Sequence, residues 1–107
     1  MKIVKKIIKE IYLNPQKQFS IEELCLISHT SRRTLYHCFD YVASQSPGIF
    51  IKCLKLNAVY QKLREVSSNS ANIYDIATSW GFWHFSHFSS DYKKMFGELP
   101  SQTRYSF

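Results

Sequence analysis

The N-terminal part of the chain has apolar residues at the spacing of an amphipathic helix. Over residues 2–13 they recur every three or four positions with lysines between them, and the predicted stripe is Ile3, Val4, Ile7, Ile8, Ile11 and Tyr12. Asn14 and Pro15 end this helix, because proline has no backbone N–H to donate and a fixed φ. No segment shows a convincing strand pattern, so the sequence predicts an all-α fold.

Capping residues locate the next two helices. Ser20, followed three positions later by Glu23, is typical of a capping box and predicts a short helix over about residues 20–27. Residues 28–30 are then a turn, and Ser31 is expected to cap a helix that runs to about Ala43.

A long helix is predicted in the middle of the chain. Pro47 suits the first turn of a helix, and the apolar pattern continues to about Val66. Residues 67–72 form a polar loop, and Asn72 is expected to cap a short helix to about Ser79.

The C-terminal part predicts one more helix over about residues 84–96. Gly97 is expected to end it, because glycine adopts the left-handed conformation that often follows a helix. Pro100 then starts a last short helical turn.

The chain contains an internal repeat. Residues 20–30 align with residues 72–82 at a shift of 52, and the helices after them align at a shift of 53. The matching pairs are Ile21 and Ile73, Glu23 and Asp75, Leu24 and Ile76, Cys25 and Ala77, Leu35 and Phe88, Phe39 and Tyr92, and Pro47 and Pro100. Each copy is therefore predicted to be a short helix, a tight turn and a longer helix.

The residues at the turn positions of the two copies differ in how readily they adopt a left-handed backbone conformation. Gly81 suits the left-handed backbone of such a turn, whereas His29 stands at the matching position and tolerates it less well. Two helices joined in this way form a helix-turn-helix unit, and two ordinary corners of a helical bundle are the alternative. On the helix-turn-helix interpretation, the first subdomain spans 1–46, a linker helix spans 47–66 and the second subdomain spans 67–107, with about seven helices in all.

Three segments carry a resemblance to a known family: residues 31–39, 46–63 and 73–104. The last opens with Ile-Tyr-Asp-Ile-Ala, continues with a Gly-Phe turn and an aromatic pair, and closes with Phe-Gly-Glu-Leu-Pro-Ser. Over nearly its whole length the chain resembles the C-terminal DNA-binding domain of the AraC/XylS family of bacterial transcription regulators. The last segment is similar to a subset that includes regulators of ethanolamine utilisation.

This resemblance implies that two recognition helices enter successive major-groove segments of double-stranded DNA. The helix that starts at Ser31 is expected to bury Leu35, Cys38, Phe39 and Val42 and to expose Arg32, Arg33, Tyr36, His37 and Asp40. The resemblance places base contacts at Arg33, Tyr36 and His37 and phosphate contacts at Arg32 and Thr34. Arginine can donate two hydrogen bonds to guanine O6 and N7. A solvated face with incidental charge is the alternative.

The second recognition helix is less clear. The resemblance places its contacts at His84, Phe85, Ser86, Ser89 and Ser90, which include no long cationic side chain. Phe85 can pack on a thymine methyl, and the serines can bind phosphates. Weak base contact and simple positioning both remain open for this helix. Further phosphate contacts are expected at Ser31, Lys52 and Lys55, although the lysines of the long helix are expected to lie in solvent.

Composition and charge favour a folded domain with an anionic partner. The chain has 107 residues, of which 45% are hydrophobic and 16% aromatic, and its net charge is +6. Residues 1–64 hold eleven Lys and Arg against four Asp and Glu, whereas residues 65–107 hold three against four. An anionic partner is therefore expected mainly at the first half. Charge alone does not separate DNA from an anionic membrane surface, and the lysine-rich helix at 2–13 keeps a module for a membrane or a protein partner open as the alternative function.

Other classes of protein find little support in the sequence. No apolar run has the length of a membrane span, and no signal peptide is evident. The three cysteines, Cys25, Cys38 and Cys53, have no paired spacing, which favours a reducing cytoplasm. His84 and His87 have no third metal ligand, and Ser31 and His37 have no carboxylate or oxyanion turn beside them. We therefore expect no enzyme, metal or cofactor.

The expected partner is double-stranded DNA, with RNA polymerase as a further candidate and activation as the expected mode of regulation. Relatives usually carry an N-terminal effector and dimerisation domain, whereas Met1 here leads almost directly into the first helix. The chain is thus expected to be a domain of a longer regulator or a short regulator, and to bind an asymmetric site as a monomer.

Overall fold

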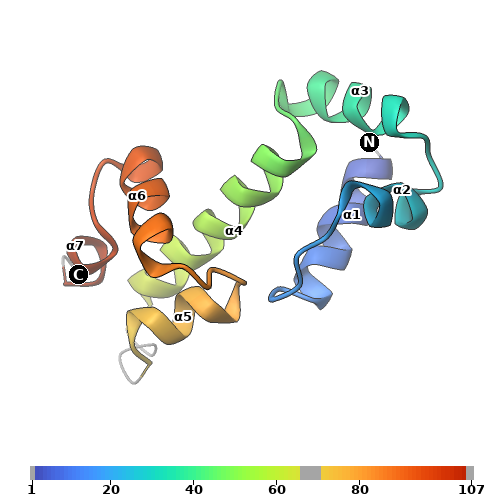
Figure 1. Ribbon diagram of the computed structural model, residues 1–107. Coiled ribbons are helices and arrows are strands. Elements are labelled where there is room, and N and C mark those ends of the chain that lie inside the picture. Colours follow the sequence, from blue (N-terminus) through green and yellow to red (C-terminus); the bar gives the residue numbers. More distant parts are fainter. Residues whose placement is uncertain (1, 66–70, 106–107) are drawn as a thin grey trace. The chain divides into compact units, whose positions relative to one another are not determined.

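The computed structural model describes residues 2–65 and 71–105, and all of its regular elements are helices (Figure 1). They are α1 (Lys2–Leu13), α2 (Ile21–Ser28), α3 (Arg32–Ala43), α4 (Pro47–Arg64), α5 (Ile73–Ser79), α6 (Phe85–Phe96) and α7 (Pro100–Tyr105). The all-α prediction is confirmed. The predicted end of the long helix at Val66 and most of the polar loop lie outside the described residues.

The chain divides into two compact units, Met1–Lys52 and Cys53–Phe107, and the boundary falls inside α4. In the first unit α2 packs against both α1 and α3 (Figure 1). The buried apolar side chains of this unit are Val4, Ile7, Ile11, Leu24, Leu35, Cys38 and Phe39. The ring of Phe39 also meets that of Phe50 edge to face, with 5.2 Å between the ring centres.

Two predicted core residues of the first unit are in fact exposed. Tyr12 is 55% exposed and Val42 is 47% exposed. Each lies in the last turn of its helix, after the part that carries the buried residues, which end with Ile11 in α1 and Phe39 in α3. In both helices the apolar pattern of the sequence therefore extends past the last residue that is buried.

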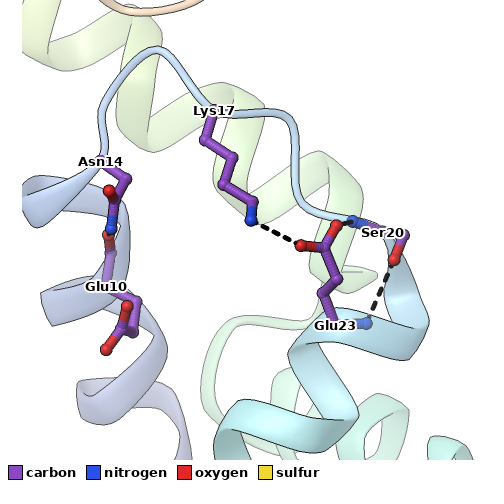
Figure 2. A network of polar contacts seen from close by, with 5 residues as sticks. All are labelled: Glu10, Asn14, Lys17, Ser20 and Glu23. Atoms are coloured by element: carbon purple, nitrogen blue, oxygen red, sulfur yellow. Dashed lines mark hydrogen bonds and ion pairs between the residues drawn. The ribbon is translucent and has the colours of Figure 1, made fainter.

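The predicted capping box at the start of α2 is confirmed (Figure 2). The backbone N–H of Glu23 donates to Oγ of Ser20, and the backbone N–H of Ser20 donates to Oε1 of Glu23, both at 3.1 Å. The other carboxylate oxygen of Glu23 lies 2.7 Å from Nζ of Lys17. The hydrogen bond to Lys17, followed by the one from the Ser20 backbone, lowers the pKa of the Glu23 carboxyl. The connection between α1 and α2 is thus tied to the first turn of α2.

The turns after α2 and α5 have the same backbone hydrogen bonds. The N–H of Thr30 donates to the carbonyl of Cys25, and the N–H of Phe82 donates to the carbonyl of Ala77, each at 3.1 Å. These pairs are related by the shift of 52 found in the sequence. The predicted left-handed positions are confirmed as well.

The conformation at those positions shows why the two residues differ. His29 has φ 56° and Gly81 has φ 87°. A side chain at positive φ brings its Cβ close to the backbone, which histidine tolerates at some cost and glycine avoids. The two turns therefore share a positive φ at the matching position as well as matching backbone hydrogen bonds.

In the second unit α6 packs against α5 and α7. A single apolar cluster joins the C-terminal part of α4 to α5 and α6: Leu56, Val59, Leu63, Ile76, Ala77, Phe88 and Tyr92. The hydroxyl of buried Tyr92 donates a 2.7 Å hydrogen bond to Oγ1 of Thr103 in α7, and Thr103 in turn donates to the carboxylate of Glu98. α7 is thus attached to α6 by a buried polar chain as well as by apolar contact.

Candidate nucleic-acid interface

α3 and α6 are 12-residue helices that have two matched buried positions in common. Leu35 and Phe39 are the fourth and eighth residues of α3, and Phe88 and Tyr92 are the fourth and eighth residues of α6. All four are essentially buried, at 0 or 1% exposure. Each helix therefore rests on its own unit in the same register, and the remaining positions can be compared residue by residue at the shift of 53.

The first two turns of α3 present a polar and cationic face. All five residues predicted to contact DNA from this helix are exposed: Arg32, Arg33, Thr34, Tyr36 and His37. The guanidinium carbon of Arg32 lies 5.7 Å from the centre of the Tyr36 ring, a cation–π arrangement between residues one helical turn apart. The face therefore combines two permanently charged donors with two side chains that can donate or accept.

The start of α3 is capped as predicted. Oγ of Ser31 accepts a hydrogen bond of 3.2 Å from the backbone N–H of Thr34 and donates one of 3.1 Å to Oγ1 of Thr34. Both residues are exposed. Their hydroxyls fix the first turn of the helix that carries Arg32 and Arg33, and the remaining acceptor and donor capacity faces solvent.

The corresponding face of α6 has a different chemistry. His84 stands at the N-cap position without a side-chain cap hydrogen bond, and no charged residue occurs from Phe85 to Ser90. His84, Phe85, Ser86 and Ser90 are exposed, whereas Ser89 is half-buried. The lysines of this helix, Lys93 and Lys94, lie in its last turn. The structure thus keeps the predicted contact residues on one accessible side of α6, with little charge among them.

One aromatic residue beside this face was missed in the sequence interpretation. Tyr74 of α5 is 51% exposed, and its ring centre lies 6.1 Å from that of Phe85. In the sequence Tyr74 is only an aromatic residue beside the apolar Ile73 of a short helix, and its nearness to Phe85 depends on how α5 and α6 cross.

The two lysines predicted to contact phosphate from α4 differ in exposure. Lys52 is exposed, whereas Lys55 is only 4% exposed, so the expectation that Lys55 lies in solvent is wrong. It is adjacent to buried Leu56 and one turn before Val59, on the side of α4 that carries the apolar cluster. Desolvation lowers the pKa of the Lys55 ammonium accordingly.

The part of the chain that the structure describes gives little support to a metal site, a catalytic serine or a membrane span. The ring centres of His84 and His87 are 5.5 Å apart, but within residues 2–65 and 71–105 no group of three His, Cys, Asp or Glu residues could hold a metal. Ser31 is engaged as the N-cap of α3, where its side chain accepts a hydrogen bond from the backbone N–H of Thr34. Of the described helices, none combines the length and apolarity that crossing a bilayer requires.

The apolar stripe of α1 was the main support for a membrane-binding module. Its central residues Val4, Ile7 and Ile11 are at most 4% exposed and belong to the core of the first unit. An amphipathic helix binds a membrane through an apolar face that is free to enter it. The stripe therefore serves packing, and the lysines of α1 remain as a solvated face.

Comparisons with known proteins agree with this geometry. Residues 24–106 match the family model described as "Helix-turn-helix domain". The XylDLEGF operon transcriptional activator of Pseudomonas putida is 34% identical over 98 residues, which are 92% of this chain and 30% of that protein. The chain thus spans less than a third of the length of this relative.

Solved structures share the fold. A transcriptional regulator of Chromobacterium violaceum, described among AraC-type DNA-binding domain-containing proteins, superposes with a TM-score of 0.85 at 25% identity, over 96% of this chain and 89% of that one. The DNA-binding domain of AdpA, solved in complex with a target DNA, has a TM-score of 0.79 at 20% identity, over 95% and 88% of the two chains. The second likeness concerns the fold alone.

Proposed function

Because this chain belongs to the AraC-type family of helix-turn-helix proteins, we propose that it binds double-stranded DNA with sequence preference and regulates transcription. The observation that carries the proposal is the accessible face of α3. It holds Arg33, Tyr36 and His37 on the side opposite Leu35 and Phe39, which anchor the helix. A helix so mounted can enter the major groove with its polar side toward the bases.

The distribution of charge supports this assignment. Eleven of the 14 Lys and Arg residues lie in positions 1–64, the part that contains α3. Contacts between cationic side chains and phosphates provide most of the sequence-independent affinity of DNA-binding proteins. Arg32, Thr34, Ser31 and Lys52 are the proposed phosphate contacts, and Lys55 is left out because it is buried.

The two helix-turn-helix units are proposed to contact successive major-groove segments. α4 has 18 residues, which corresponds to a length of about 27 Å. This is of the same order as the helical pitch of B-DNA, about 34 Å, which separates such segments along one face. In this arrangement α3 supplies most of the base recognition and α6 adds a second, less charged contact.

Activation is the proposed mode of regulation, since the similar Pseudomonas protein is described as a transcriptional activator. RNA polymerase is the proposed further partner of such an activator, and the cytoplasm is its proposed location. Binding by one copy of the chain to an asymmetric site is proposed because the two units carry different residues on α3 and α6.

Selection of bound duplexes from a random pool tests the proposal, followed by titration of the selected duplex against an unrelated one at several salt concentrations. We expect an enriched asymmetric sequence, a preference for it over the unrelated duplex, and an affinity that falls steeply with salt. Recovery of a pool without any enriched sequence would contradict the proposal.

A further inference from the structure

The first two turns of α6 offer an apolar ring among small hydroxyls where α3 offers cations. At the shift of 53, Phe85 takes the position of Arg32 and Ser86 that of Arg33, while Ser89 and Ser90 take those of Tyr36 and His37. The matching burial of the two helices makes this correspondence a structural one. The first two turns of α6 therefore have no Arg or Lys that could donate to guanine O6 and N7. If this helix recognises a base, it does so through another feature of the base edge.

The ring of Phe85 is held in place on one side and open on the other. Its centre lies 5.5 Å from the ring of Phe88 and 6.1 Å from the ring of Tyr74. Phe88 is 1% exposed and belongs to the core, whereas Phe85 itself remains 39% exposed. An aromatic side chain supported in this way presents a fixed apolar surface and loses little conformational freedom on binding.

Small exposed side chains on the accessible side of α6 leave room for this ring to approach a groove. Ser86 and Ser90 are exposed and small, and the nearest lysines of the helix lie in its last turn. In the major groove the one apolar group at a base edge is the 5-methyl group of thymine, and phenylalanine is among the side chains that contact it.

We propose that Phe85 determines specificity by packing on a thymine methyl group in the groove segment that α6 enters. The proposal rests on DNA binding as the function and deepens it, because it assigns the base feature that the second unit recognises. The competing account is that Phe85 is only the exposed end of the apolar stripe formed by Phe88 and Tyr92.

The test replaces each thymine of the selected duplex in turn by uracil, which removes the methyl group and nothing else. We expect one or two positions at which uracil weakens binding about fourfold, the effect of losing one buried methyl-sized group. At a cytosine substituted for such a thymine, 5-methylcytosine should be bound more tightly than cytosine. Neither change touches the protein, so folding of a variant does not enter this result.

Protein variants then assign the effect to Phe85. In Phe85→Ala the ratio between thymine and uracil duplexes should fall to about one, and in Phe85→Leu it should be partly retained. Met95→Ala is the matched control, because it truncates another exposed apolar residue of α6, 43% exposed and in the last turn. Met95→Ala and Arg33→Ala should both keep the ratio of the unaltered chain.

Two results distinguish a failure of the role of Phe85 from a failure of DNA binding itself. If the selected duplex is preferred but uracil is neutral at every position, or if Phe85→Ala keeps the ratio, the role of Phe85 is overturned and DNA binding stands. If no duplex is preferred at all, the proposed function is overturned and this inference with it.

Discussion

The guanidinium group of Arg32 lies over the ring of Tyr36, with 5.7 Å between the guanidinium carbon and the ring centre. Both residues stand on the exposed face of α3, and Tyr36 is 37% exposed. The contact holds the long Arg32 side chain along the helix before any DNA is bound. A side chain ordered in advance loses less conformational entropy when it binds.

Replacement of Tyr36 should reveal this contact. Tyr36→Leu removes the aromatic ring and should weaken binding to the selected duplex by about 0.5–1 kcal/mol more than Tyr36→Phe, which keeps the ring. Fluorescence anisotropy with labelled duplex measures both. In an Arg32→Ala background the difference between the two substitutions should shrink, and a difference that persists unchanged there would contradict the role of the stack.

The salt dependence of binding should identify the phosphate contacts. Arg32→Ala and Lys52→Ala should each reduce the slope of log affinity against log salt by about 1, because each removes one phosphate contact. Lys55→Met is the control: its ammonium is buried, so the slope should stay at the value of the unaltered chain. A reduced slope in Lys55→Met would show that this lysine reaches the DNA after all.

Two glycines should respond in opposite ways to alanine. Gly97 ends α6 at φ 75°, where a Cβ is strained, although nothing lies within 4 Å of its position. Gly97→Ala should therefore destabilise the protein by about 1–2 kcal/mol through the backbone alone. Gly48 lies in the first turn of α4, also without close neighbours, and Gly48→Ala should stabilise it by about 0.5 kcal/mol. Thermal unfolding of both variants checks the pair, and equal shifts would be inconsistent with the conformation at Gly97.

Tyr92 should make stability depend on alkaline pH. Burial raises the pKa of its hydroxyl to about 12, above the value of about 10 expected in the unfolded chain. Because the folded state holds this proton more tightly, the stabilisation is fully present below pH 10 and is lost as the pH rises toward 12.

The variant Tyr92→Phe isolates this effect from other groups that titrate in the same range. At pH 8 it should cost about 1 kcal/mol through loss of the hydrogen bond to Thr103. Urea unfolding at pH 8, 10 and 11 should then show a smaller loss of stability with pH than in the unaltered chain. Parallel pH curves for the two proteins would rule out Tyr92 as the source.

Local signals in the sequence were sufficient for the helix boundaries that capping residues mark. The hydroxyl of Ser20, the carboxylate of Glu23 and the backbone of Gly97 act within a few residues, so their capping roles could be predicted from spacing. The left-handed conformation of His29 followed from its alignment with Gly81, because the repeat transfers the geometry of one turn to the other.

Burial at individual helix positions could not be predicted in the same way. Val42 continues the apolar period of α3 but is exposed, and Lys55 interrupts the apolar pattern of α4 but is buried. Whether such a position is covered depends on the neighbouring helices and on where their contact ends, and the apolar period of one helix contains neither piece of information. The support of Phe85 by Tyr74 likewise depends on the crossing of α5 and α6.

The comparison of Arg33→Ala with Lys52→Ala over a panel of single-base variants of the selected duplex tests the central claim most directly. If α3 contacts base edges, Arg33→Ala should lose about 1–3 kcal/mol and its preference at one base pair, because a bidentate contact to guanine disappears. Lys52→Ala should weaken binding to every duplex by the same factor. A uniform loss in both variants would show that α3 does not recognise bases, and would contradict the account.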